Sequence, residues 1–187
     1  MKKIISLVLA TLIPVLFFAG CSSNQSKDVD YPVTVEGVTL NKSPENVVVL
    51  SDSLADVILK MGYERKLVGR SDQVDQKDLL VLPSVGDALQ PNIDKIKELK
   101  TDLILSEAEL SDQFKQLCDQ NNIPFIKINK ASNRVDFSRL YTDVGCATSG
   151  AKTGYERGNA KSQDLILEID DIIRRIPQTS IPITACY

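Results

Sequence analysis

Residues 44–53, Pro-Glu-Asn-Val-Val-Val-Leu-Ser-Asp-Ser, decide the fold of this chain. The apolar run Val47–Leu50 predicts a short buried strand, because polar residues bound it on both sides. After Ser51–Ser53 the apolar residues recur at the spacing of one helical face, at Leu54, Val57, Ile58 and Met61, and Gly62 is typical of a helix end. The order of buried strand, polar turn and helix is the unit from which parallel α/β sheets are built.

The same order returns further along the chain. Leu103–Ser106 and Phe125–Ile128 predict two more buried strands, and between them lies a helix with an apolar face of Leu110, Phe114, Leu117 and Cys118. Leu67–Arg70 predicts a shorter strand, and Pro91 opens a helix whose inner residues are Ile93, Ile96 and Leu99. This alternation predicts the α/β fold class, with a parallel sheet flanked by helices.

The segments on either side of this core have a different character. Tyr31–Leu40 alternates around Gly37, which predicts an edge hairpin ahead of the sheet. Residues 137–144 predict a short helix, and Gly154–Ile176 predicts a long one. The apolar stripe of the long helix consists of Leu165, Ile166, Ile169, Ile172, Ile173 and Ile176. From Ile181 to Tyr187 the pattern is that of a beginning strand.

Polar residues follow the predicted strands. Parallel strands bring their carboxyl ends to one edge of a sheet, and ligands bind at that edge. The candidate ligand-binding residues are therefore Ser51, Asp52, Arg70, Ser71, Gly86, Asp87, Ala88, Ser106 and Glu107. Some of these positions have a structural alternative. For residues 51–53 it is helix capping, since Ser53 and Asp56 have the spacing of a capping box. Arg70 is equally consistent with a surface ion pair to Asp72 or Asp75.

The residue types argue against catalysis. The chain contains no histidine, and histidine is the commonest catalytic base and metal ligand. We therefore expect no enzyme activity, no metal site and no cofactor. Gly145–Thr153 approaches the phosphate-binding P-loop pattern, but Ala151 intrudes before the lysine and a helical segment precedes it. We interpret this stretch as the loop ahead of the long helix. The formal net charge is −3 with interspersed signs, so no nucleic-acid partner is expected.

The first residues predict export and attachment to a membrane. Lys2 and Lys3 precede an apolar run over residues 4–19, which suits a secretory signal and is short for a membrane span of ~20 residues. Residues 18–21, Phe-Ala-Gly-Cys, resemble the bacterial lipobox, which implies lipid attachment at Cys21. The expected location is the outer face of the bacterial cytoplasmic membrane. The polar stretch that follows is typical of a flexible tether.

The remaining cysteines are Cys118, Cys146 and Cys186. Cys118 lies on the apolar face of its predicted helix, where a buried, inert thiol is expected. Whether Cys146 pairs with Cys186 stays open, because separation in sequence does not give distance.

An ordered set of these segments resembles the substrate-binding proteins of ABC importers, in the class that handles cobalamin, iron-siderophores and haem. The matching segments are residues 44–51 with 54–56, then 67–70, 82–86, 91–96 and 99–105. The resemblance implies two α/β lobes joined by a long helix, with a metal-chelate or corrinoid type of ligand in the cleft between them. It also implies an ABC permease as partner, with Asp94 as the residue that docks onto it.

The resemblance covers the N-terminal half of such a protein. We expect a signal peptide over residues 1–20, a lipidated tether over 21–30, an N-terminal lobe over 31–135, a connecting helical segment over 136–177 and the start of a second lobe over 178–187. The rest of that lobe is absent from the sequence, so either the chain is truncated or a partner supplies the lobe. We expect a truncated form with weak binding alone. The alternative is a stand-alone surface lipoprotein that binds a protein partner through the stripe of its last helix.

Overall fold

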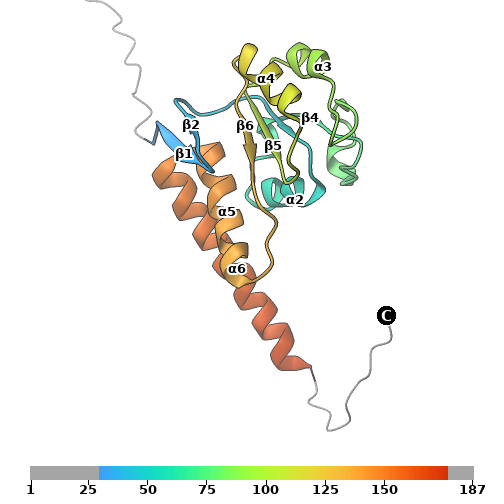
Figure 1. The fold of residues 1–187 in the computed structure, drawn as a ribbon. Coiled ribbons are helices and arrows are strands. Elements are labelled where there is room, and N and C mark those ends of the chain that lie inside the picture. The colour runs from blue at the N-terminus through green and yellow to red at the C-terminus, as the bar shows by residue number, and fades with distance from the viewer. Residues whose placement is uncertain (1–29, 177–187) are drawn as a thin grey trace, which may run out of the picture.

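The structure, a computed structural model, describes residues 30–176. Its centre is a four-stranded parallel sheet in the order β4-β3-β5-β6 (Figure 1). The strands are β3 (Val47–Val49), β4 (Leu67–Arg70), β5 (Leu103–Ser106) and β6 (Phe125–Lys127). In register, Val48 lies beside Ile104, and Leu105 lies beside Ile126. The predicted α/β class and parallel sheet are confirmed.

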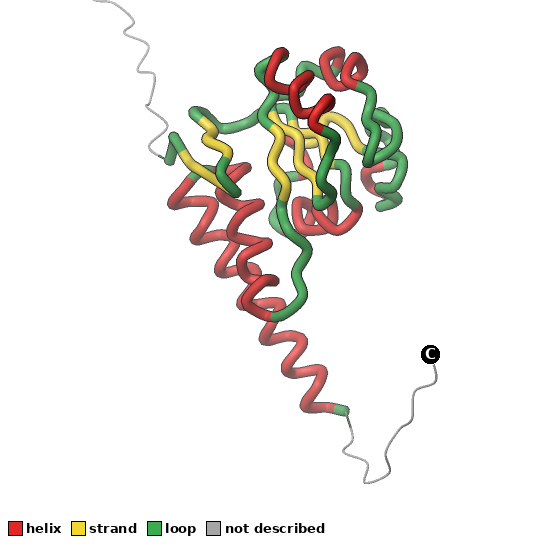
Figure 2. Tube along the Cα trace, viewed as in Figure 1, coloured by secondary structure: helices red, strands yellow, loops and turns green. Residues whose placement is uncertain are grey.

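Different helices cover the two faces of the sheet, and Figure 2 shows the strands between them. Val47, Val49 and Leu105 point into a core shared with α2 (Asp52–Lys60) and α5 (Arg134–Ser149). Val48, Leu50 and Ile104 point to the other side, where α3 (Ile93–Glu98) and α4 (Asp112–Gln120) contribute Ile96, Phe114 and Cys118. Burial on both faces explains why the strand sequences are continuously apolar.

Short 3₁₀ helices η1 (Glu64–Lys66) and η2 (Lys77–Leu79) lie on either side of β4 in the chain. The start of α2 differs from the predicted capping box. The helix begins at Asp52 and its N-cap is Ser51, so Ser53 lies inside the helix and cannot form the box with Asp56. The predicted end is correct, because Gly62 has a φ of 74° just past the helix, a conformation that glycine adopts without strain.

The last two helices form a close antiparallel hairpin. The long helix α6 spans Ala151–Arg175, and Gly150, with φ 88°, is the only residue between it and α5. The prediction of a loop over Gly145–Thr153 is therefore wrong, because all of this stretch except Gly150 is helical. Likewise the predicted short helix over 137–144 is part of the longer α5, and α6 begins before Gly154.

The predicted hairpin is present as β1 (Val33–Val35) and β2 (Val38–Leu40), paired antiparallel. It forms a sheet of its own instead of an edge of the main sheet, and β1 contacts α5. Just before it, the carboxylate of Asp30 accepts hydrogen bonds from the amides of Lys152 (3.2 Å) and Thr153 (3.4 Å). Asp30 is distant from α6 in sequence, but its carboxylate accepts hydrogen bonds from amides in the first turn of this helix, which have no partner inside the helix.

Several sequence predictions fall outside the described residues. They are the signal peptide, the lipid attachment at Cys21, the tether up to residue 29, and the start of a second lobe over 178–187 with its strand from Ile181. Cys118 is buried and Cys146 is half-buried, and neither pairs with a cysteine among residues 30–176. Whether Cys146 pairs with Cys186, which lies outside the described residues, stays open. Among the helices of residues 30–176, none is long and apolar enough to cross a membrane.

Candidate functional site

The carboxyl ends of the four parallel strands meet at one edge of the sheet, which we call the polar rim. Backbone hydrogen bonds fix this edge: the amide of Ser71 donates to Val49 (3.1 Å), and that of Ile128 donates to Ser106 (2.8 Å). Ser51 joins two strand ends, because its Oγ accepts from the backbone amide of Glu107 at 2.8 Å. The rim therefore brings together residues that are separated by more than fifty positions in sequence.

Arg70 and Asp52 lie at the side of the rim formed by β4 and β3. The guanidinium of Arg70 donates to the carbonyls of Ser71 (3.0 Å) and Val74 (3.1 Å), in place of the alternative pairing with Asp72 or Asp75. Its Nε is buried without a hydrogen-bond partner among the residues that the structure describes. Asp52 accepts from the amide of Asp75 at 3.1 Å, so its carboxylate holds the loop that follows β4.

Ser71 and Ser106 lie behind the rim. Both are fully buried, and the Oγ of Ser71 donates to the carbonyl of Leu50 at 2.7 Å. The Oγ of Ser106 accepts from the amide of Ala108 at 3.0 Å and donates to its carbonyl at 3.1 Å. The two serines shape the strand ends and the loops that follow them, because their hydroxyls are already paired inside the protein.

The loop containing Gly86, Asp87 and Ala88 forms another part of the rim. Gly86 has φ 98°, and its carbonyl accepts from the amide of Asp72 at 2.8 Å. Asp87 accepts from the amides of Leu89 (2.8 Å) and Gln90 (3.1 Å). These contacts lower the pKa of Asp87, with the bond from Leu89 as the largest cause.

Gln73 fixes this loop, and the sequence analysis missed it. Its amide nitrogen donates to Asp87 at 2.6 Å, and its amide oxygen accepts from the backbone of Ala88 at 2.9 Å. No sequence pattern marks Gln73, because the contact exists only after the loops after β4 and before α3 have come together.

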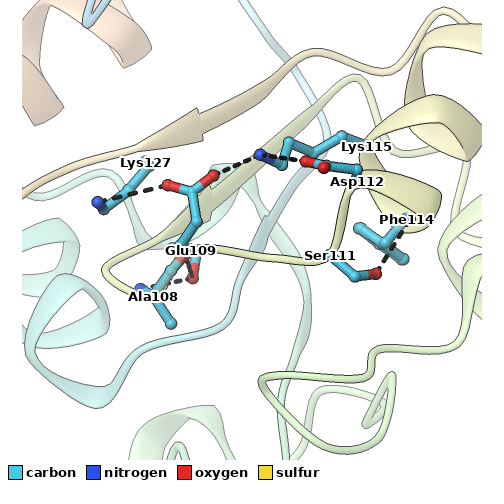
Figure 3. Close-up of polar contacts among 8 residues, drawn as sticks. Ala108, Glu109, Ser111, Asp112, Phe114, Lys115 and Lys127 are labelled. Carbon is cyan, nitrogen blue, oxygen red and sulfur yellow. Dashed lines mark hydrogen bonds and ion pairs between the residues drawn. The ribbon is translucent and has the colours of Figure 1, made fainter.

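A charged cluster stands above the ends of β5 and β6 (Figure 3). Glu109 lies between Lys115 (2.5 Å) and Lys127 (3.4 Å), and Lys115 also contacts Asp112 at 3.2 Å. The hydrogen bond from Lys115 is the largest cause that lowers the pKa of Glu109, and the same bond raises the pKa of Lys115. None of these residues was predicted from the sequence. Glu107, which was predicted, has a buried Oε1 without a hydrogen-bond partner among residues 30–176.

A cavity of about 390 Å³ opens beside the rim. It lies between Leu89–Pro91 and the start of α4, and its lining includes Ser111, Phe114 and Leu117. The Oγ of Ser111 caps α4 by accepting from the amide of Phe114 at 3.2 Å. The cavity is thus bounded by the loop that Gln73 fixes and by a helix start.

Asp94 lies in the first turn of α3, and its side chain is 80% exposed. Its amide donates to Asn92 at 2.9 Å, and its carboxylate lies 3.6 Å from Lys97. An acid in this position also interacts favourably with the helix dipole. Within the part of the chain that the structure describes, no group of three or more acidic or cysteine side chains is placed to hold a metal ion.

The parallel sheet and its flanking helices match part of the fold of two-lobe periplasmic binding proteins. No family model matches the chain. It is 30% identical over 77% of its length to the ABC transporter substrate-binding lipoprotein YvrC of Bacillus subtilis, and 32% identical over 58% to the Fe(3+)-citrate-binding protein YfmC of the same organism. The chain covers 50% and 39% of these relatives, so it spans about half of their length or less.

Solved structures of similar fold include periplasmic proteins of Vibrio cholerae. The vitamin B12-binding protein BtuF matches with a TM-score of 0.56 at 20% identity, over 72% of this chain and 52% of that one. The haem-binding protein HutB matches with a TM-score of 0.60 at 17% identity, also over 72% and 52%. The predicted resemblance to ABC substrate-binding proteins is confirmed. The relatives are transport proteins and not enzymes.

Proposed function

We propose that this chain provides one wall of the ligand cleft of an ABC importer's substrate-binding protein. The relevant ligands are iron-siderophore, haem or cobalamin-like molecules. The supporting observation is the polar rim, where the strand register brings Ser51, Arg70 and Glu107 to one edge of a parallel sheet. The names of YfmC and of the petrobactin-binding protein YclQ support an iron chelate as the ligand type.

Arg70 and Glu107 are the groups best suited to contact a ligand. Each has a buried polar atom, Nε or Oε1, that lacks a partner within residues 30–176. A buried polar atom without a partner is costly, and a polar ligand at the rim would offset that cost. Ser51, Asp52 and the loop of Gly86, Asp87 and Ala88 complete the wall, and Ser71 and Ser106 support it from behind.

One wall leaves a large part of such a ligand in water. A single wall makes few contacts with the ligand, and these contacts must offset the translational and rotational entropy that the ligand loses on binding. We therefore expect weak binding by this chain alone. We propose that residues 31–135 form the N-terminal lobe and that residues 136–177 form the connecting helical segment.

The test is a titration of the purified chain with cobalamin, haem and ferric citrate, followed by the absorbance of each ligand. We expect weak binding of one ligand, which Arg70→Gln abolishes and Arg65→Gln preserves, because Arg65 is exposed on η1 away from the rim. A ligand that binds both variants equally would refute the role of the rim. A sub-micromolar complex would refute the expectation of weak binding.

We also propose an exported, lipid-anchored location and contact with a membrane permease. YvrC is a lipoprotein by name, and the lipobox-like residues 18–21 supply the modification site at Cys21. Labelled palmitate should enter the wild-type chain and not Cys21→Ser. For docking, Asp94→Ala should weaken co-purification with the permease, whereas Glu98→Ala, also exposed on α3, should not.

A second candidate function is that of a stand-alone surface lipoprotein that binds a protein partner. The observation that favours it is the exposure of Leu167, Ile169, Ile172 and Ile173 on α6 and of Ile176 just after it. A permease gene beside this gene would support the importer, and its absence together with strong protein binding through α6 would support the second function.

A further inference from the structure

The polar rim carries an excess of negative charge. The segments that follow the strand ends or meet them are residues 51–53, 70–76, 84–90, 106–115 and 127–131. Their acidic side chains are Asp52, Asp72, Asp75, Asp87, Glu107, Glu109 and Asp112, and their basic side chains are Arg70, Lys115, Lys127 and Lys130. Seven acids against four bases give the rim a formal net charge of −3, which equals that of the whole chain. A surface of one sign changes the local concentration of charged ligands.

Ion pairs neutralise only one part of the rim, the charged cluster above β5 and β6. Glu109 lies between Lys115 and Lys127, as Figure 3 shows. Lys115 also contacts Asp112 at 3.2 Å. Two acids and two lysines thus balance one another within this cluster. The negative charge of the rim comes from its other acidic side chains.

Five acidic side chains of the rim form no ion pair with any residue among 30–176. They are Asp52, Asp72, Asp75, Asp87 and Glu107. Neutral groups hold some of them in place: Asp52 accepts from a backbone amide at 3.1 Å, and Asp87 from the amide of Leu89 at 2.8 Å. The bond from Leu89 is the largest cause that lowers the pKa of Asp87, so this carboxylate is charged at neutral pH. The protein fixes these carboxylates without compensating their charge.

Glu107 also needs a hydrogen-bond donor. Its Oε1 is buried and has no partner within residues 30–176. Its backbone amide donates to the Oγ of Ser51 at 2.8 Å, which fixes Glu107 at the end of β5 beside the end of β3. A buried acceptor without a donor is unfavourable, and a charged donor forms the strongest hydrogen bond with a carboxylate.

We propose that the rim selects a metal chelate that carries a cationic group, such as a pendant ammonium, at its periphery. Glu107 accepts a hydrogen bond from this group, and the surrounding carboxylates stabilise its charge. The inference rests on the proposed importer function and narrows its ligand class. It disfavours haem and ferric citrate, because their carboxylates face a surface of the same sign.

Arg70 complements this arrangement. Its guanidinium donates to backbone carbonyls and to no carboxylate among the described residues. It is therefore available to the oxygen atoms that ligate the metal, which carry partial negative charge. Because β3 lies between β4 and β5, Arg70 and Glu107 stand two strand spacings apart, about 10 Å. A single chelate molecule can bridge that distance, with its core at Arg70 and its cationic group at Glu107.

The test uses three ferric trihydroxamates that share one coordination core and differ only in charge. Ferrioxamine B carries a pendant ammonium, its N-acetyl derivative is neutral, and its N-succinyl derivative carries a carboxylate. The whole chain, purified in mild detergent, is titrated with each by equilibrium dialysis at low ionic strength. We expect the ammonium form to bind at least about tenfold more tightly than the succinyl form, with the acetyl form between them. The difference should shrink in about 1 M salt, where the screening length falls to about 3 Å.

A variant of Glu107 tests the contact itself. Glu107→Gln keeps the shape of the side chain and removes its charge. It should weaken binding of the ammonium form at least about fivefold and change binding of the acetyl form little. Glu156→Gln is the matched control, since Glu156 is exposed on α6 outside the rim, and it should change neither.

Three outcomes would overturn the inference and leave the proposed function standing. The first is equal affinity for the three trihydroxamates. The second is tighter binding of haem, ferric citrate or cobalamin than of the ammonium form. The third is an unchanged preference for the ammonium form in Glu107→Gln, which would place the cationic group elsewhere. No binding of any of these ligands at millimolar concentration would refute the proposed function as well.

Discussion

Gly145 on α5 and Gly154 on α6 face each other, backbone against backbone, across the helix hairpin. A Cβ on either glycine would overlap the carbonyl of the other residue, and Gly158 makes a similar approach to Tyr141. Backbone atoms cannot rotate away as a flexible side chain can. The hairpin therefore depends on the absence of side chains at these positions, and its tight contact explains why one residue, Gly150, suffices as the joint.

Gly154→Ala should destabilise the protein strongly. The added methyl group meets the carbonyl of Gly145, so the helices must move apart, and overpacking of this kind costs about 1–3 kcal/mol. Urea unfolding followed by circular dichroism gives the loss as a lower midpoint. Glu156→Ala, exposed on the same helix, should stay close to wild type. Equal midpoints for the two variants would show that the helices separate without cost.

The sequence predicted the sheet because its signals are local. Val47–Leu50 and Leu103–Ser106 are continuously apolar, and the helices that follow have regular spacing and polar starts. The joint at Gly150 was not predicted, because Thr148, Ser149 and two nearby glycines have a composition typical of loops. Tertiary contact overrides that composition, since the glycines are needed where the helices touch.

The candidate site was predicted only as a set of positions. The ends of parallel strands converge by topology, which is why Ser51, Arg70 and Glu107 could be named in advance. The hydrogen-bond and ion-pair partners around them could not be predicted. Gln73 and the pairing of Glu109 with Lys127 depend on loops that meet only in the folded chain, and the sequence carries no periodic signal for such contacts.

Ser51→Ala should cost about 1 kcal/mol, the typical value of one hydrogen bond, because the amide of Glu107 loses its acceptor. Ser53→Ala is a matched control two residues away. The Oγ of Ser53 is buried and has no hydrogen-bond partner within residues 30–176, so its removal should be neutral or stabilising. The free energies of unfolding of the two variants, together with hydrogen exchange at the Glu107 amide, measure the difference. Similar values would mean that Ser51 does not hold the two strand ends together.

Asp143 should make stability depend on pH. Burial, assisted by Glu36 and opposed by Arg139, raises the pKa of Asp143 to about 6 from 3.8. The folded state thus binds the proton more tightly than the unfolded state does. Stability should fall as pH rises from about 4 to 6, because the carboxylate becomes charged while partly buried.

Asp143→Asn removes this titration. The variant should lose the slope between pH 4 and 6, and it should gain no more than about 1 kcal/mol at pH 7, since the group is half exposed and solvent screens it. Thermal unfolding across this pH range measures both effects. Asp164→Asn, an exposed carboxylate of α6, should keep the wild-type slope. If stability depends on pH equally in Asp143→Asn and in wild type, other titrating groups cause the slope.

Cys118 should resist alkylation in the folded protein. Cys118 is 1% exposed on the buried face of α4, and desolvation, with a smaller contribution from Asp119, raises the pKa of its thiol to about 11. At pH 8 the reactive thiolate is then on the order of one part in a thousand. Iodoacetamide labelling, resolved by peptide mass spectrometry, should proceed at Cys118 at least about a hundredfold more slowly in buffer than in urea, where exposure and an ordinary pKa return together. Rapid labelling in buffer would mean that α4 opens readily from the sheet, and the apolar packing of Phe114 and Cys118 would then not be what holds that helix in place.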